Sequence, residues 1–359
     1  MVRQKSSLEG TYRPVKLDKA GLAAVAFDRF KHEYPALFKE SSAYQLSRAA
    51  ADMEDHVGAL QESLATGRPA LFLDYVHHAS TFFAFRHLPP PYIPDGLRIL
   101  REVIRDQLDG DLRERAEKIL GTGIVAARKI SPEPPSGIDD SDPLSGTAHA
   151  YLEALIRTDR NKAGEILTAA ADSGVPLRDL YLRIFVPVLQ ETGRLWEIQK
   201  LSVAEEHYIT ASIGAEMTRL HDRYIPGGVR GSPEGKTVLV AAVEGDLHEI
   251  GIRMIADFFE MDGWSTYYIG PNTPALSLLR AARERNVDLI VISCSMPPFL
   301  PTLHYLIRSL HADAGTKKIK ILVGGHPFAV DPPLWKQIGA DAYAKDAVDA
   351  VGTAHRLMG

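Results

Sequence analysis

Three residues that follow an apolar run have types and spacing suited to metal chemistry. The run Val238–Val243 ends in a polar turn with Asp246, His248 and Gly251 in the pattern D-x-H-x-x-G. A neutral imidazole is a good ligand for a transition metal, and a carboxylate two residues away can accept its other ring N–H, which fixes the tautomer. Because the pattern is short and occurs by chance in roughly a few per cent of chains, its surroundings decide its meaning.

Two further strand ends make the pattern more specific. Ser293 lies at the end of the apolar strand predicted at 288–293, and forty-one residues separate it from Gly251. Gly324 and Gly325 directly follow the next apolar strand, 319–323. Glycine and serine at strand ends let a ligand approach the backbone closely. The blocks D-x-H-x-x-G, serine and G-G, in this order and spacing, resemble the cobalamin-binding module of methionine synthase and its relatives.

The resemblance implies a role for each residue. His248 is implied as the lower ligand to cobalt, with Asp246 accepting its other ring N–H. The displaced nucleotide tail of the cofactor needs a channel, and its implied lining is Gly251, Ser293, Gly324 and Gly325. Ser295, a further implied contact, is a departure, because the family often has leucine or threonine there. The alternative is an ordinary histidine at a helix start, with glycines that only form turns.

The composition is that of a globular protein of two or three domains. The chain has 359 residues, of which 45% are hydrophobic and 24% charged, and a net charge of -5. This balance gives no basic footprint for nucleic acid, so we expect no direct contact with DNA. The single cysteine, Cys294, excludes an internal disulfide. No apolar stretch reaches the ~18 residues of a membrane span, and we expect a cytoplasmic protein.

The pattern along the chain predicts four regions. Residues 17–120 have helical spacing throughout, and a Pro/Gly/Ser-rich segment follows them. We predict an all-α, globin-like N-terminal domain at 1–125, a linker at 126–146, a four-helix bundle cap at 147–225 and an α/β doubly wound, Rossmann-like domain at 234–359. The predicted cap helices are 148–158, 162–172, 176–197 and 202–224. The predicted strands lie near 238–243, 265–269, 288–293, 319–323 and 341–344.

A second constellation lies in the predicted cap. Trp196 is followed after nine residues by Glu206 and His207, with Val203 between them. This W-x9-E-H pattern resembles the cap of cobalamin-dependent photoreceptors of the CarH type. There the tryptophan covers the upper axial group, usually 5′-deoxyadenosyl, and a carboxylate can hold ribose hydroxyls. Those photoreceptors have histidine after the tryptophan, whereas this chain has Glu197. The alternative is a core tryptophan and a solvated pair.

A third resemblance concerns the N-terminal domain. The segment 72–89, rich in aromatic residues and histidine, resembles the globin-like domain of photocobilins, which bind biliverdin as well as cobalamin. Helical spacing places His78 beside Phe82 and Phe85, so His78 is the candidate ligand of the bilin, and Arg86 could meet its propionates. Such a bilin must be non-covalent, because the only thiol is Cys294. The alternative is an aromatic core stripe or a dry docking surface.

These features leave three functions open. The first is a light sensor, in which cleavage of the Co–C bond of adenosylcobalamin shifts the cap against the sheet. The second is a corrinoid methyl carrier for a separate methyltransferase, against which the bulky Trp196 argues. The third is a mutase subunit that needs a partner barrel. Without a catalytic constellation, we predict a non-enzymatic photoreceptor that acts as a homo-oligomer or through a separate output protein.

Overall fold

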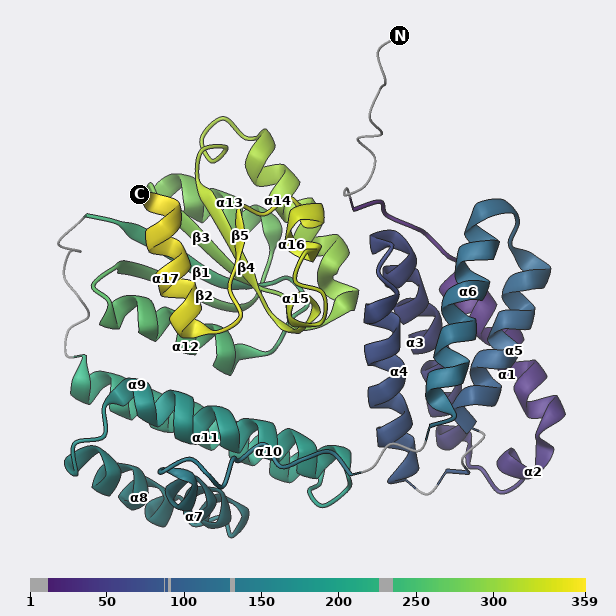
Figure 1. Cartoon of the computed structure of the whole chain (residues 1–359), viewed down its shortest axis with the longest axis horizontal. Helices are drawn as coiled ribbons and strands as arrows, with labels where there is room; N and C mark the ends of the chain where they lie inside the picture. Colours follow the sequence, from purple (N-terminus) through teal and green to yellow (C-terminus); the bar gives the residue numbers. More distant parts are fainter. Residues whose placement is uncertain (1–11, 87, 90–91, 130–132, 226–234) are drawn as a thin grey trace.

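The chain forms three bodies that lie against one another (Figure 1). The computed structural model describes residues 12–86, 88–89, 92–129, 133–225 and 235–359. We name the bodies the N-terminal domain (12–129), the cap (133–225) and the sheet domain (235–359). The sheet domain and the cap lie one above the other in Figure 1, and the N-terminal domain lies beside them, with helix α4 nearest to both.

The N-terminal domain is helical in the part that the structure describes. Its helices are α1 (Lys19–Glu33), α2 (Pro35–Phe38), α3 (Ala43–Thr66), α4 (Pro69–Ala84), α5 (Tyr92–Gln107) and α6 (Gly110–Ala127). Ser42 begins α3 with a reciprocal capping box, and Gly67 ends it in the left-handed conformation at φ 64°. Pro69 then starts α4 in the first turn, where a missing N–H is harmless. The closer likeness of this domain to a globin stays a prediction.

The cap is also helical, with one departure from the predicted pattern. Its helices are α7 (Ser145–Ile156), α8 (Arg160–Asp172), α9 (Leu177–Leu180), a π-helical turn (Tyr181–Phe185), α10 (Val186–Glu197) and α11 (Val203–Tyr224). The single helix predicted at 176–197 is therefore interrupted. Pro187 explains the interruption, because proline cannot donate to the preceding turn and its ring crowds the carbonyl four residues earlier.

The sheet domain contains five parallel strands in the order β2-β1-β3-β4-β5. The strands are β1 (Thr237–Val243), β2 (Ser265–Thr273), β3 (Leu289–Ser293), β4 (Lys320–Gly324) and β5 (Ala342–Tyr343). The helices are α12 (Glu249–Met261), α13 (Ala275–Arg285), α14 (Leu300–Ala312), α15 (His326–Val330), α16 (Leu334–Ile338) and α17 (Ala347–Met358), with a 3-10 turn, η2 (Pro297–Phe299). This is the predicted doubly wound arrangement, and its switch point lies between β1 and β3.

The two faces of the sheet join different neighbours. Side chains alternate along β1, so that Val238, Val240 and Ala242 share a buried core with α12, α17 and the cap helices. Those on the opposite face share a core with α13, α14 and α16. Three side chains of the N-terminal domain complete this second core: Tyr12, Ala65 and Leu71. Each face of the sheet is therefore covered partly by its own helices and partly by another domain.

Candidate functional site

The predicted site residues meet at the switch point of the sheet. Asp246 and His248 follow the carboxyl end of β1, and Ser293 ends the adjacent strand β3, where it pairs with Ala242. In open parallel sheets the crevice outside these two strand ends is the usual place for a ligand. The strand order thus brings together two blocks of sequence that lie more than forty residues apart.

Asp246 is fully buried and accepts four hydrogen bonds. One oxygen accepts from the backbone N–H of His248 (3.1 Å) and contacts Nδ1 of its ring (2.8 Å) and Oγ of Ser295 (2.7 Å). The other accepts from the backbone N–H of Ser295 (2.7 Å). Burial alone would raise the pKa of Asp246, but the bonds from His248 and Ser295 outweigh it and lower the pKa. The carboxylate therefore stays ionised and fixed.

His248 presents one ring nitrogen outward. Its contacts with Asp246 and Ser295 are both made by Nδ1, and the side chain is 63% exposed. The hydrogen bond to Asp246 raises the pKa of His248, burial opposes this, and the charges of Asp246 and Glu206 add to it. With Nδ1–H donated to the carboxylate, Nε2 is the nitrogen available to bind a metal.

The glycines of the motif differ in whether the surrounding backbone requires glycine. Gly325 has a φ of 115°, and a Cβ there would lie 2.0 Å from the carbonyl oxygen of Cys294, so only glycine fits. Gly324 pairs with Ser293 across β3 and β4. A Cβ at Gly251 would meet nothing within 4 Å. Gly251 thus borders open space at the start of α12, whereas Gly325 is required by the protein backbone itself.

The cap places the start of α11 near His248. Ser202 begins this helix with a capping box, and Val203 on its first turn is 54% exposed. Glu206 accepts from Thr210 (2.8 Å) and contacts His207. The charge of Glu206 acts on the ring of His248, whereas the side chain of His207 is 74% exposed. The structure therefore brings Glu206, from the cap, toward the sheet edge.

Trp196 has a neighbour that sequence reasoning missed. It lies at the end of α10, and its ring is 5.6 Å from that of Phe82 on α4. The next residue, Glu197, pairs with Nδ1 of His78 at 2.9 Å. The Nδ1 atom of His78, predicted from the sequence as a candidate ligand of a bilin, therefore faces a carboxylate of the cap.

Sequence reasoning singled out Val203 but missed two exposed apolar side chains next to motif residues. Leu247 is 72% exposed and Met296, directly after Ser295, is 45% exposed. Val203 adds a third exposed apolar side chain from the cap. Large apolar side chains grouped at one place mark a surface that a ligand or partner covers. The sequence signal that could have found Leu247 and Met296 was their position next to His248 and Ser295. Sequence reasoning also missed that Ser295 holds Asp246 by two hydrogen bonds.

This set of donors fits one kind of metal group. Among the described residues no three His, Cys, Asp or Glu side chains are grouped so that they could enclose an ion. His248 alone offers a single imidazole, which fits a metal whose other ligands come from a macrocycle. The exposed apolar side chains beside it suit the flat face of such a macrocycle, and the open space at Gly251 suits a chain that descends from it.

Comparisons with known proteins identify the macrocycle. Two B12 binding domain families match, one at residues 236–352 and one at residues 147–220. The chain is 31% identical over 171 residues to the dimethylamine corrinoid protein of Methanosarcina barkeri, which covers 47% of this chain and 78% of that protein. For dimethylamine corrinoid protein 3 of Methanosarcina mazei the identity is 30%, over 47% of this chain and 99% of the relative. The chain belongs to the corrinoid protein family.

A solved structure supports the fold of this corrinoid protein. The monomethylamine corrinoid protein of Methanosarcina barkeri aligns with a TM-score of 0.52 at 19% identity, over 60% of this chain and 100% of that one. Cobalamin binding, predicted from the D-x-H-x-x-G, serine and G-G blocks, is supported by the two family matches and the corrinoid relatives. Both family matches begin after residue 146, so the N-terminal domain is additional to the shared part.

The prediction of a photoreceptor was wrong. The relatives are corrinoid proteins named for methylamines, which agrees with the alternative of a methyl carrier. The physical reason for the error is Trp196, whose bulk was taken as a cover for an adenosyl group. The ring of Trp196 also packs on Phe82, and the finding that overturns the photoreceptor is the kinship with methylamine corrinoid proteins. The comparisons give no support to the biliverdin prediction, which came from a separate resemblance of residues 72–89.

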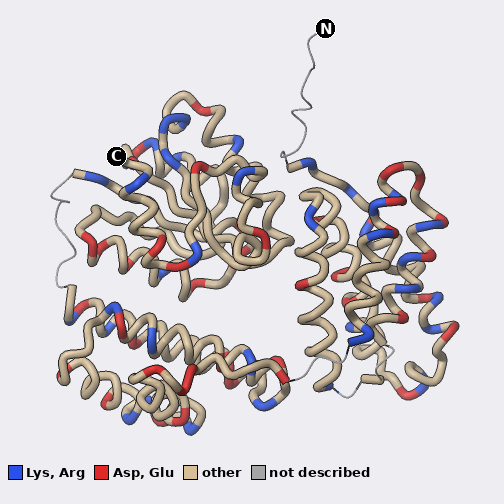
Figure 2. The backbone as a smooth tube through the Cα atoms, viewed as in Figure 1, with Lys and Arg blue, Asp and Glu red and all other residues tan. Residues whose placement is uncertain are grey.

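Two surface properties complete the description. Acidic and basic residues are interspersed over all three bodies (Figure 2). Among the described residues, no helix has the length and apolar character needed to cross a bilayer.

Proposed function

We propose that this protein is a corrinoid methyl carrier that serves a separate methyltransferase and does not itself catalyse the transfer. The observation that carries the proposal is the imidazole of His248, held through Nδ1 by buried Asp246 at the switch point. The relatives add the chemistry, because dimethylamine and monomethylamine are compounds with methyl groups to donate.

The residues of the sheet domain would hold the corrinoid. His248 would be its lower ligand through Nε2, and Asp246 would keep the imidazole in the required tautomer by accepting from Nδ1–H. Ser295 would orient Asp246 through its backbone N–H and its hydroxyl. The residues proposed to border the nucleotide tail are Gly251, Ser293, Gly324 and Gly325. The bound corrinoid supplies a cobalt ion that can accept a methyl group and release it.

The cap would cover the other side of the corrinoid. We assign Val203 and Glu206 to this cover, because Val203 is exposed on the first turn of α11 and the charge of Glu206 reaches His248. Trp196 would border the same space from α10, while His207 would contribute only at its rim. We propose that the corrinoid carries a methyl rather than an adenosyl group, since the relatives are named for methylamines.

The test of the ligand assignment is an absorption spectrum of the protein loaded with hydroxocobalamin. The wild type should show the histidine-ligated spectrum, and His248→Ala should lose it. Asp246→Asn should keep the spectrum and weaken binding by about 10–100-fold. A matched control is His149→Ala, which removes another histidine paired with an aspartate, on the exposed surface of the cap. An unchanged spectrum in His248→Ala would reject the assignment.

The test of the carrier role uses isotope-labelled methylcobalamin. Protein loaded with it should pass the label to a thiol when a corrinoid-dependent methyltransferase is added, and His248→Ala should reduce the rate. Transfer at the rate of free methylcobalamin, with no dependence on the protein, would contradict the carrier role.

A further inference from the structure

Helix α4 of the N-terminal domain carries one row of chemically active side chains. The row is Asp74, His78, Phe82 and Arg86, and Arg86 lies two residues beyond Ala84, where the helix ends. Residues four apart lie above one another on the same helix face. The row therefore runs along the face of α4 from its first half to its end.

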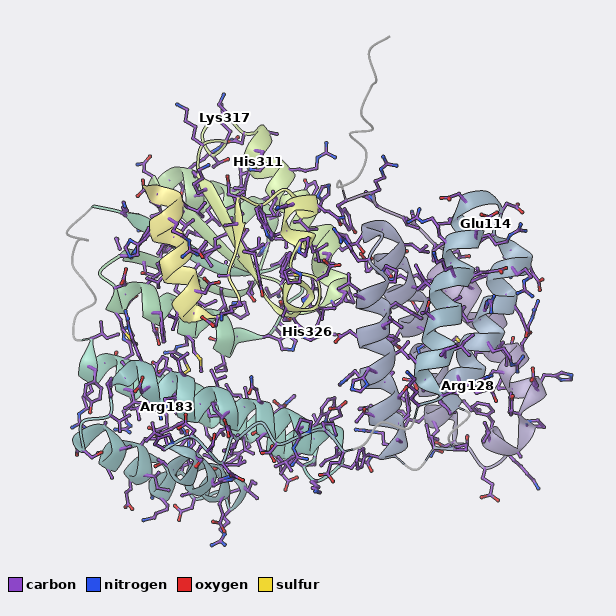
Figure 3. All side chains as sticks on the ribbon, in the orientation of Figure 1. Glu114, Arg128, Arg183, His311, Lys317 and His326 are labelled. Carbon is purple, nitrogen blue, oxygen red and sulfur yellow. The ribbon has the colours of Figure 1, made fainter. Side chains whose placement is uncertain are left out.

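The row joins the two parts of the proposed corrinoid site. At one end, Asp74 pairs with Nε2 of His326 at 2.7 Å. His326 directly follows Gly325 at the end of β4, and Figure 3 shows it at the border of the sheet domain that faces α4. Further along, His78 pairs with Glu197 at the end of α10. One helix thus contacts the sheet edge with Asp74 and the cap with His78.

Arg86 adds further contacts between the N-terminal domain and the cap. The guanidinium of Arg86 lies 3.2 Å from the ring centre of Phe82 and 5.8 Å from that of Trp196. The same guanidinium donates to the backbone oxygens of Phe82 (3.0 Å) and Glu197 (3.1 Å). A cation that lies over one ring, beside a second, and donates to two carbonyl oxygens ties these groups together. Trp196 is therefore held from the side of the N-terminal domain.

This arrangement adds an element that the shared corrinoid fold lacks. The two B12-binding matches cover 147–220 and 236–352, which leaves α4 outside both. Yet α4 contacts His326 and Glu197. These residues directly follow Gly325 and Trp196, which the proposed function assigns to the border of the site.

We propose that α4 is a third wall of the corrinoid site, which restricts access to the side of the cobalt opposite His248. This inference rests on the proposed binding of a corrinoid by His248. The wall is closed where Phe82, Arg86 and His78 meet Trp196 and Glu197. A methyltransferase that takes the methyl group must therefore separate α4 from the end of α10.

The test measures how fast a small ligand reaches the cobalt. Protein loaded with hydroxocobalamin is mixed with cyanide, and exchange of the upper ligand is followed by absorption. Phe82→Ala and His78→Ala should each accelerate the exchange, by about tenfold for Phe82→Ala, because the aromatic and cation contacts are lost. The matched controls are Tyr44→Ala and His32→Ala, which truncate exposed side chains of the same domain and should leave the rate unchanged.

A charge exchange removes the ambiguity of a damaged fold. His78→Glu places two carboxylates together and should accelerate the exchange of cyanide. Adding Glu197→Lys to this variant restores an opposite pair and should return the rate toward that of the wild type. Recovery in the double variant supports the wall, since a misfolded domain is not repaired by a second substitution.

Two results overturn the inference in distinguishable ways. Equal exchange rates in the wild type, Phe82→Ala and His78→Glu, with cobalamin bound in each, reject the wall and leave the proposed carrier intact. Failure of the wild type to bind hydroxocobalamin at all rejects both the wall and the carrier.

Discussion

The N-terminal domain contacts the sheet domain and the cap in two different ways. Toward the sheet domain it places Tyr12, Ala65 and Leu71 in a shared buried core, each at most 4% exposed. Toward the cap it offers His78, whose side chain is 55% exposed, and the Phe82–Trp196 ring contact. The contact with the sheet domain is buried and apolar like a protein interior. The contact with the cap includes a partly exposed ion pair.

This difference in burial indicates which of the two contacts of the N-terminal domain separates more easily. Burial of apolar area is the dominant favourable contribution to a domain interface, whereas an exposed ion pair contributes about 0–1 kcal/mol. We infer that the N-terminal domain and the sheet domain move as one body. The contact between α4 and the end of α10 is the weaker of the two, which suits a place where a partner protein enters.

The largest effect should come from the apolar contact. Leu71→Ala removes a side chain that is 2% exposed, and it should lower the free energy of unfolding by about 2–5 kcal/mol. Urea unfolding followed by circular dichroism measures the loss. Leu276→Ala, which truncates a leucine that is 73% exposed, is the control. If Leu71→Ala lowers the free energy of unfolding no more than Leu276→Ala does, the contact with the sheet domain is as weak as the contact with the cap.

A smaller loss should follow from Tyr12→Phe. The Tyr12 hydroxyl donates to Glu62 at 3.0 Å, and the carboxylate is 3% exposed, with its pKa raised by burial. Loss of the donor leaves Glu62 with one fewer partner, and the free energy of unfolding should fall by about 1–3 kcal/mol. Tyr305→Phe, at an exposed tyrosine, is the control. Equal unfolding curves for Tyr12→Phe and the wild type would contradict this role.

The contact with the cap should matter least for stability. Glu197→Gln weakens the pair with the half-exposed His78, and the free energy of unfolding should fall by less than about 1 kcal/mol. The same urea titration tests it. A loss as large as that of Leu71→Ala would show that the α4 contact is structural, and the comparison between the two contacts would then fail.

The contact between the cap and the sheet domain has a pH dependence of its own. His221 of α11 pairs with Glu260 at 2.6 Å, with Asp257 and Asp222 also near. Burial lowers the pKa of His221, but the bond to Glu260 and the surrounding charges outweigh it and raise the pKa. A raised pKa means stability that is complete below the unfolded value of about 6.5 and lost as pH rises through the folded value.

The corresponding experiment compares Tm across pH. The wild type should exceed His221→Gln by about 1–3 °C near pH 6, and the difference should shrink toward pH 9. A difference that grows with pH would reverse the sign and reject the charge on His221 as its cause.

The sheet and the edge that carries Asp246 and Ser293 could be predicted from the sequence because both depend on local patterns. Apolar strands separated by helices imply a parallel sheet, and the carboxyl ends of adjacent strands must meet, which brings Asp246 to Ser293. The length of β2 and the π-helical turn before Pro187 were not predicted. The turn had a visible signal in Pro187, which was placed inside a continuous helix.

The contacts of α4 could not be predicted in the same way. His326 and Asp74 are 252 positions apart, and Arg86 and Glu197 are 111 positions apart. No periodicity links such positions, so nothing in the local sequence shows that Trp196 has an aromatic partner. The spacing from Trp196 to Glu206 was interpreted through one resemblance, to photoreceptors, and the corrinoid relatives overturned that interpretation.

The position of Tyr12 has a consequence for how the chain is made. Its backbone N–H donates to the carbonyl of Gln337, so the surface that covers Tyr12 and Leu71 is synthesised after most of the chain. During translation, at about 5–20 residues per second, the newly folded helices expose an apolar patch. The sheet domain that covers this patch is synthesised many seconds later. Truncated or stalled products of this chain should therefore aggregate and need chaperones, although the helices of the N-terminal domain themselves are complete.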